Sequence, residues 1–183
     1  STDDDETGAP ASAEALSEAG DSMTASEAVS SIETGNLSFT RQDAMAHLDA
    51  RMGLELAVTE LLLGRLTEEQ LLHLRRLAEH VSEVLDRDGI LDIDEFGKRN
   101  EEFHEYLFIV SDNPTFFDSF RRLDVHNQIV SALHDDGWIS PEIDREHFAF
   151  VEAFENNDLQ AANQILREHN QHAQRTMTEG VAA

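Results

Sequence analysis

Three histidines are the residues whose types and positions in this sequence most clearly suggest chemistry. His104 follows Phe96 and Asn100 at steps of four residues, and His147 and His169 also fall among apolar residues that recur at helical spacing. Each is therefore expected on the buried side of a different helix. A single histidine in such a place is usually a core residue with its hydrogen bonds satisfied, whereas three on helices of one bundle could converge. Imidazole is the commonest protein ligand for transition metals, so the pattern predicts a divalent ion such as zinc, nickel or iron.

A fourth donor is expected from the residue that precedes His104 by one helical turn. Asn100 projects toward the same place as His104, because side chains four residues apart share a helix face. Three imidazoles and one oxygen form a mononuclear site with room for water or an anion. The predicted ligands are thus Asn100, His104, His147 and His169, and His172 could reach the edge of this site.

A different metal site can be drawn from the same residues. Glu101-x-x-His104 and Asp144-x-x-His147 resemble the Glu-x-x-His pairs of di-iron bundles, although the second pair has aspartate. The two additional glutamates that such a site needs would come from Glu55, Glu60 and Glu83.

The stretch LDRDGILDIDEF, residues 85–96, resembles a calcium loop. With Gly89 at the sixth position, Asp86, Asp88 and Glu95 fall on ligand positions, but Val84 occupies the first, where an oxygen donor is required. We therefore interpret the stretch as a structural connector, in which Gly89 ends one helix and residues 92–95 cap the next.

Composition restricts the possible functions. The chain has 38 acidic and 13 basic residues and a formal net charge of −25, so it should repel nucleic-acid phosphates and anionic lipid. It has no cysteine, which excludes disulfides and thiolate ligands and favours a cytoplasmic location. No apolar run approaches the length of a membrane span.

The pattern of the remaining residues is helical. Residues 1–38 are predicted to be a disordered acidic tail, and residues 39–180 to form one domain. Capping signals at TRQD (40–43), TEEQ (67–70), DIDE (92–95), SPE (140–142) and NND (156–158) start helices, and a further helix is expected to carry Phe116 through Ile129. Six or seven helices with short connections predict an all-α antiparallel bundle.

The ordered set of motifs resembles a known family. ARMGLELAVTELLLGRLTEEQLLHLRRL (50–77), NEEFHEYLFIVSDNP (100–114) and REHFAFVEAFENNDLQAANQILREHNQH (145–172) are similar to segments of the FCD domain, the ligand-binding C-terminal domain of FadR-type GntR transcription regulators. The resemblance implies an all-α antiparallel bundle that forms homodimers. It also implies a divalent metal held by one aspartate and three histidines, with a small carboxylate effector on or beside the metal.

Carried over residue by residue, the three histidines are His104, His147 and His169, the same three that periodicity selects. Asn100 stands where the family has aspartate, so the site would carry one negative charge less. Arg51 resembles the arginine that meets the effector carboxylate, although an ion pair with Glu55 is the alternative. DNA would be contacted only through a winged helix-turn-helix, for which this sequence shows no candidate.

Three functions follow as hypotheses. The first is a non-enzymatic, metal-dependent effector-sensing domain of a bacterial transcription regulator. The second is a metal-dependent enzyme, either a di-iron oxidase or a mononuclear hydrolase. The third is a metal-free module whose apolar cavity binds an acyl chain or lipid.

Overall fold

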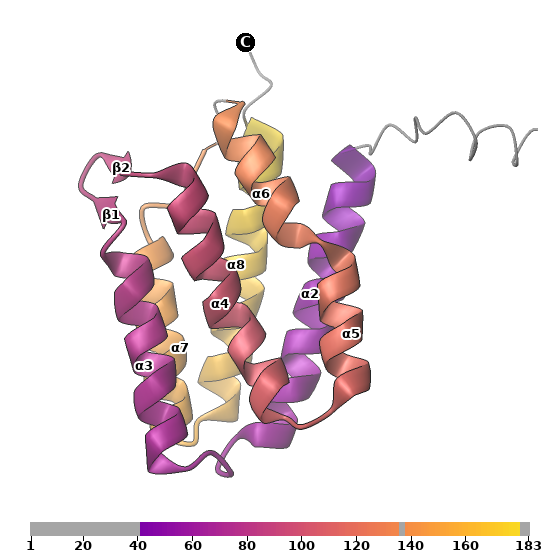
Figure 1. The fold of residues 1–183 in the computed structure, drawn as a ribbon, viewed down its shortest axis with the longest axis vertical. Coiled ribbons are helices and arrows are strands. Elements are labelled where there is room, and N and C mark those ends of the chain that lie inside the picture. The colour runs from indigo at the N-terminus through magenta and orange to yellow at the C-terminus, as the bar shows by residue number, and fades with distance from the viewer. Residues whose placement is uncertain (1–40, 136–137, 180–183) are drawn as a thin grey trace, which may run out of the picture. The chain divides into compact units, whose positions relative to one another are not determined.

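Helices make up most of the described structure. The computed structural model describes residues 41–135 and 138–179. Its helices are α2 (Arg41–Leu62), α3 (Glu68–Ser82), α4 (Ile93–Val110), α5 (Pro114–Leu123), α6 (Val125–His134), α7 (Ile143–Glu155) and α8 (Leu159–Glu179). A two-stranded antiparallel hairpin, β1 (Leu85–Asp86) and β2 (Gly89–Ile90), connects α3 to α4. The predicted all-α helical bundle is therefore confirmed (Figure 1).

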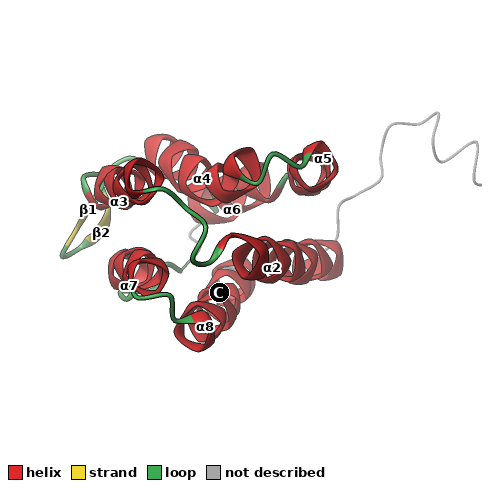
Figure 2. Cartoon of the chain, turned by 90° about the horizontal axis from the view of Figure 1, so that it is seen from below, coloured by secondary structure: helices red, strands yellow, loops and turns green. Residues whose placement is uncertain are grey.

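The helices pack so that α4, α7 and α8 share one interior. Helix α8 packs along α2 and α7, α3 packs on both α4 and α7, and α4 also contacts α2, α5 and α6. Seen end-on in Figure 2, α2, α8 and α7 face α3, α4 and α5. The side chains between them form one apolar core rich in phenylalanine: Phe96, Phe103, Phe108, Phe120, Phe150 and Phe154. Three of the helices that meet there carry the predicted histidines.

Two helix starts occur where the sequence places them. Thr67 caps α3 in a complete capping box: its hydroxyl accepts from the backbone N–H of Gln70 at 3.2 Å, and Gln70 Oε1 accepts from the N–H of Thr67 at 2.9 Å. Asp92 caps α4 by accepting from the N–H of Glu95 at 3.0 Å. These caps fix where α3 and α4 begin.

Two other expectations about helix ends are wrong. The single helix predicted from Phe116 through Ile129 is broken at Asp124, whose left-handed backbone (φ 50°) ends α5 and begins α6. Ser140 does not cap α7, which begins at Ile143; its hydroxyl instead accepts from the N–H of Glu142 in the turn before the helix.

The acidic stretch at residues 85–96 is a hairpin followed by a helix cap. One carboxylate oxygen of Asp86 accepts from the N–H groups of Asp88 and Gly89, at 2.8 and 3.0 Å. Gly89 has φ 132°, which a side chain would disfavour. It does not end a helix as predicted, because α3 ends at Ser82. Turn and cap bonds thus explain these acidic residues as a structural connector.

The acidic tail predicted for residues 1–38 lies outside the described residues. None of the helices that the structure describes is both long enough and apolar enough to cross a membrane.

Candidate metal centre

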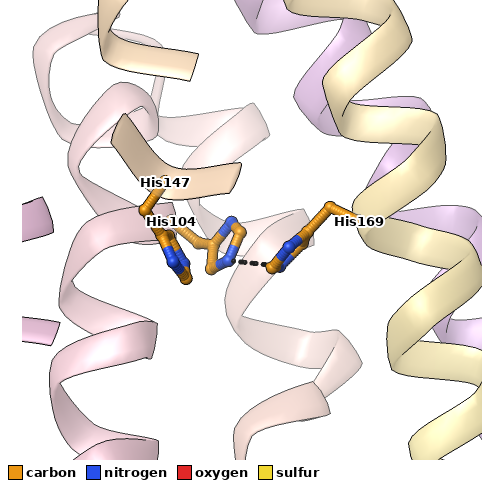
Figure 3. A group of neighbouring side chains, drawn as sticks. All are labelled: His104, His147 and His169. Atoms are coloured by element: carbon orange, nitrogen blue, oxygen red, sulfur yellow. Dashed lines mark hydrogen bonds between the residues drawn. The ribbon is translucent and has the colours of Figure 1, made fainter. Parts of the chain in front are cut away.

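The three histidines predicted from periodicity point toward one another in the interior (Figure 3). His104 comes from α4, His147 from α7 and His169 from α8, and all three are buried. Each offers a ring nitrogen, and the three nitrogens lie within 4.8 Å of one another. The Nε2 atoms of His104 and His169 are 3.1 Å apart. With metal–nitrogen bonds of about 2.1 Å, that distance lies between the edge of an octahedral site, about 3.0 Å, and that of a tetrahedral site, about 3.4 Å.

The outward nitrogen of each ring has a hydrogen-bond acceptor of its own. His104 Nδ1 donates to Glu55 Oε1 at 2.5 Å, and His169 Nδ1 donates to Glu146 Oε2 at 2.8 Å. His147 Nδ1 donates to the carbonyl of Ile143 at 2.8 Å. A neutral imidazole carries only one N–H, so these bonds leave a lone pair on every Nε2. Outer partners that orient ligand histidines in this way are typical of metal sites.

Asn100 adds a fourth electron-pair donor to this group. Its side-chain oxygen lies 3.1 Å from Nε2 of His147, whose own proton is on Nδ1. The Nε2 atoms of His104 and His169 likewise face each other with a lone pair on each. Lone pairs that face one another in a buried site repel unless a cation or a proton lies between them. The residues present therefore fit a divalent metal held by three nitrogens and one oxygen.

Burial keeps His104 and His147 in the neutral form that a metal requires. It lowers the pKa of His104, and the nearby Arg51 guanidinium lowers it further, although Glu55 opposes both effects. Burial also places the pKa of His147 well below its usual range. Glu55 is buried too, which raises its pKa, but the charges of His104 and Arg51 more than offset this effect and lower it. At neutral pH the rings of His104 and His147 are thus neutral and Glu55 is ionised.

Arg51 is a buried cation next to this cluster. Its side chain is only 1% exposed, and its Nε lies 3.7 Å from Glu55 Oε2, an ion pair that is too long for a hydrogen bond. Nε and Nη1 are buried and have no hydrogen-bond partner among the described residues. Unpaired buried donors are costly, so this guanidinium is suited to an anion that would accept from it.

The structure does not bring together the carboxylates of a di-iron site. Of the three glutamates that the sequence offers, only Glu55 contacts a histidine. Glu83 pairs with Arg99 at 2.7 Å, and Glu60 is exposed on α2. Periodicity thus selects three histidines that converge, whereas of the three additional glutamates proposed for a di-iron site only Glu55 lies beside them.

Sequence reasoning missed Glu146, which supports two histidines of α8. Its two oxygens accept from Nδ1 of His169 and from Nδ1 of His172. His172 is 32% exposed at the edge of the cluster, as its spacing from His169 suggests. Glu146 immediately precedes His147, and helix periodicity assigns a buried side to only one of two adjacent residues. Both are buried here because His147 faces α4 while Glu146 faces α8.

A small cavity adjoins the cluster between α4, α6, α7 and α8. Its volume is about 30 Å³, and it shares Asn100 and His169 with the histidine cluster. The other lining residues are mostly apolar: Phe96, Ile129, Leu133, Ile139, Ile143 and Ala173, with Ser140, His172 and Thr176.

The fold and the site define an all-α domain with a buried cluster of three histidines that could hold a metal. A family model, the FCD domain, matches residues 46–172. The chain therefore belongs to the FCD domain family of GntR-type transcription regulators. Neither the comparison with curated proteins nor the comparison with solved structures found a match.

Proposed function

We propose that residues 39–180 form the metal-dependent, effector-sensing C-terminal domain of a GntR-type regulator. The ion would be held by Asn100, His104, His147 and His169, and the effector would be a small carboxylate. The observation that carries the proposal is the convergence of three Nε2 lone pairs and one amide oxygen in a buried space. Nitrogen-rich sets with one oxygen suit zinc, nickel or iron.

Charge supports the effector half of the proposal. The four proposed ligands are neutral. The two buried carboxylates of Glu55 and Glu146 therefore balance the two positive charges of a divalent ion. Arg51 then adds one positive charge with unpaired donors. When bound, the metal supplies a Lewis-acidic position for the effector carboxylate, and Arg51 orients that carboxylate with its free N–H groups.

Sensing requires that the effector bind two arrangements of the helices unequally. The proposed ligands lie on α4, α7 and α8, and Glu55 adds α2 through its bond to His104. A carboxylate drawn into the site would favour one relative placement of these helices. In a homodimer, that placement would alter the spacing of attached winged helix-turn-helix domains and so their binding to DNA. No step of this proposal requires catalysis.

The first test is metal content after purification and dialysis against zinc. We expect about one ion per chain in the parent protein and strong loss in His147→Ala and His169→Ala. His80→Ala, an exposed histidine of α3, is the matched control and should keep its metal. Asn100→Asp should bind zinc more tightly than the parent because it adds an anionic ligand. Full metal content in both buried-histidine variants would contradict the site.

The apolar cavity does not favour the acyl-binding alternative. A volume of about 30 Å³ accommodates about two water molecules. A long acyl chain needs far more room than this.

A further inference from the structure

The cavity beside the histidines limits what the effector can be. Asn100 and His169 belong both to the proposed ligand set and to the cavity lining, so the cavity opens directly on the metal position. An anion bound there can extend the rest of its structure into this space. The following inference rests on the proposed function, because it assigns the chemistry of the effector at that same site.

The lining of the cavity is suited to hydrocarbon. Phe96, Ile129, Leu133, Ile139 and Ile143 supply most of its wall, and no arginine or lysine of the described residues lines it. Burying an apolar group against an apolar wall makes the free energy of binding more favourable, whereas burying a charged group there makes it less favourable.

The polar side chains of the lining already make hydrogen bonds. The Ser140 hydroxyl accepts from the N–H of Glu142, and the Thr176 hydroxyl donates to the carbonyl of His172. His172 donates to Glu146. The Ser140 O–H and the lone pairs of Thr176 remain available, so the lining disfavours a charged group on the ligand tail but does not exclude a hydroxyl.

A ligand with a single negative charge would balance the buried charges of the site. Among the buried residues, Glu55 and Glu146 offset the two charges of a divalent ion, and Arg51 leaves one positive charge, which the half-buried Glu101 carboxylate offsets in part. A monocarboxylate brings the buried group to neutrality. A dicarboxylate leaves a second carboxylate in the apolar cavity without a cation, which is strongly disfavoured.

Size sets the length of the tail. Room for about two waters corresponds to a tail of about two to three non-hydrogen atoms. We propose that the effector is a short-chain aliphatic monocarboxylate, bound with its carboxylate at the metal and its hydrocarbon tail in the cavity lined by Phe96, Ile139 and Ala173.

The loop before α7 carries a reporter for this event. Trp138, the only tryptophan of the chain, lies over the guanidinium of Arg175 at 4.0 Å and 6.1 Å from the ring of His172. The next two residues, Ile139 and Ser140, line the cavity. A ligand that enters the cavity should therefore change tryptophan fluorescence.

The experiment is calorimetric titration of the full chain loaded with zinc, with tryptophan fluorescence as a second readout. The probes are butyrate, succinate and octanoate. We expect butyrate to bind at least tenfold more tightly than each of the others and to change the fluorescence of Trp138. Zinc-loaded protein that binds succinate or octanoate as tightly as butyrate overturns the tail assignment.

Two cavity variants test the location. Ala173→Leu should fill the cavity and weaken butyrate binding at least tenfold while zinc content stays at the parent level. Gln171→Leu, an exposed position on the same helix, is the control and should leave butyrate binding unchanged. Ile139→Ala, which does not overpack the interior, should shift the preference toward hexanoate. Unchanged butyrate binding in zinc-loaded Ala173→Leu, or an unchanged length preference in Ile139→Ala, overturns the assignment.

These outcomes separate the two proposals. A parent protein that retains no zinc, or that retains zinc and binds none of the carboxylates, overturns the proposed function itself. Zinc-loaded protein that binds a carboxylate of another class leaves the sensor intact and overturns only the short aliphatic tail.

Discussion

Two carboxylates that are not proposed as metal ligands determine the tautomer and orientation of His104 and His169. Glu55 and Glu146 hold the outward nitrogens of His104 and His169, and without them either ring could take the other tautomer. These hydrogen bonds place the proton on Nδ1 and therefore leave the lone pair on Nε2, which faces the interior. The residue that positions a ligand can therefore matter nearly as much as the ligand.

We predict that Glu55→Gln weakens zinc binding about 10- to 100-fold. The amide has the shape of the carboxylate but lacks the negative charge that strengthens the bond to His104 and offsets Arg51. Competition with a chelating dye would measure the affinity. Glu60→Gln, an exposed glutamate of the same helix, should bind zinc like the parent. Equal affinities for the parent and Glu55→Gln would show that Glu55 does not support the site.

The metal-free protein should lose stability as the pH falls below about 6.5. The pKa of His104 is about 4 in the folded chain, against an ordinary value of 6.5. Between these values the unfolded chain binds a proton that the folded chain does not, so the free energy of unfolding decreases as the pH falls. The lowered pKa of Glu55 has the same sign and extends the loss to lower pH.

Thermal unfolding with a chelator at pH 7, 5.5 and 4.5 would measure this loss. Sodium chloride at 0.5 M keeps changes in net charge from dominating the result. The melting temperature of the parent should fall over this range, and that of His104→Gln should fall less. A parent whose melting temperature stays constant or rises toward pH 4.5 would contradict a buried neutral His104.

The burial of a single residue could be predicted from sequence only where its position on one helix face is sufficient to determine it. His104, His147 and His169 each lie on an apolar stripe, so periodicity finds them without knowledge of the partner helices. Glu146 could not be found in this way, because its burial depends on α8, which packs beside it. Likewise, nothing in the spacing of Arg51 shows that two of its donors lack partners.

At the scale of elements, the sequence predicts a helix start where the cap and its bonding partners are local. Thr67 and Asp92 cap helices through bonds within four residues, so the sequence contains the whole cause. The break at Asp124 has no such signal: aspartate tolerates a left-handed backbone but does not require it. Packing of α5 against α2 and of α6 against α4 accompanies this break.

The approach of α4 to α6 depends on a glycine. A Cβ atom added to Gly97 of α4 would lie 2.2 Å from Cγ2 of Val130 and 3.0 Å from Cε1 of His126, both on α6. Valine is short and branched, so it cannot swing away without moving its helix. Gly97 lies one turn before Asn100, and the close contact of α4 and α6 therefore helps to place the proposed oxygen ligand.

We predict that Gly97→Ala lowers the free energy of unfolding by about 1–3 kcal/mol, even though alanine is the better helix former. Gly53→Ala is the matched control, because Gly53 also lies within a helix but a Cβ there meets nothing within 4 Å. It should raise stability by about 0.5–1 kcal/mol. Urea denaturation of both variants gives the comparison, and a stabilised Gly97→Ala would show that the approach of α4 to α6 is looser than described.

At the scale of the whole molecule, charge opposes folding while packing favours it. The formal net charge of −25 sits on a chain with only 13 basic residues, so most carboxylates have no cation to pair with. Compaction brings these charges closer together and raises their mutual repulsion. The surface ion pairs that do form, such as Arg75 with Glu155 at 2.6 Å, are partly exposed and each contribute little.

Salt should therefore stabilise this protein. The Debye length falls from about 30 Å at 0.01 M to about 8 Å at 0.15 M, so added salt screens the repulsion between carboxylates that are not in direct contact. We predict that the melting temperature of the metal-free protein rises by about 3 °C or more between 0.01 and 0.5 M sodium chloride, which corresponds to about 1 kcal/mol for a chain of this size. Potassium chloride at equal ionic strength should give the same rise, because screening depends on ionic strength and not on the identity of the cation.

Differential scanning calorimetry at pH 7 would measure both series. A melting temperature that is constant or falls with salt would mean that the paired charges outweigh the unpaired ones, and a rise with only one of the two salts would point to a bound cation instead of screening.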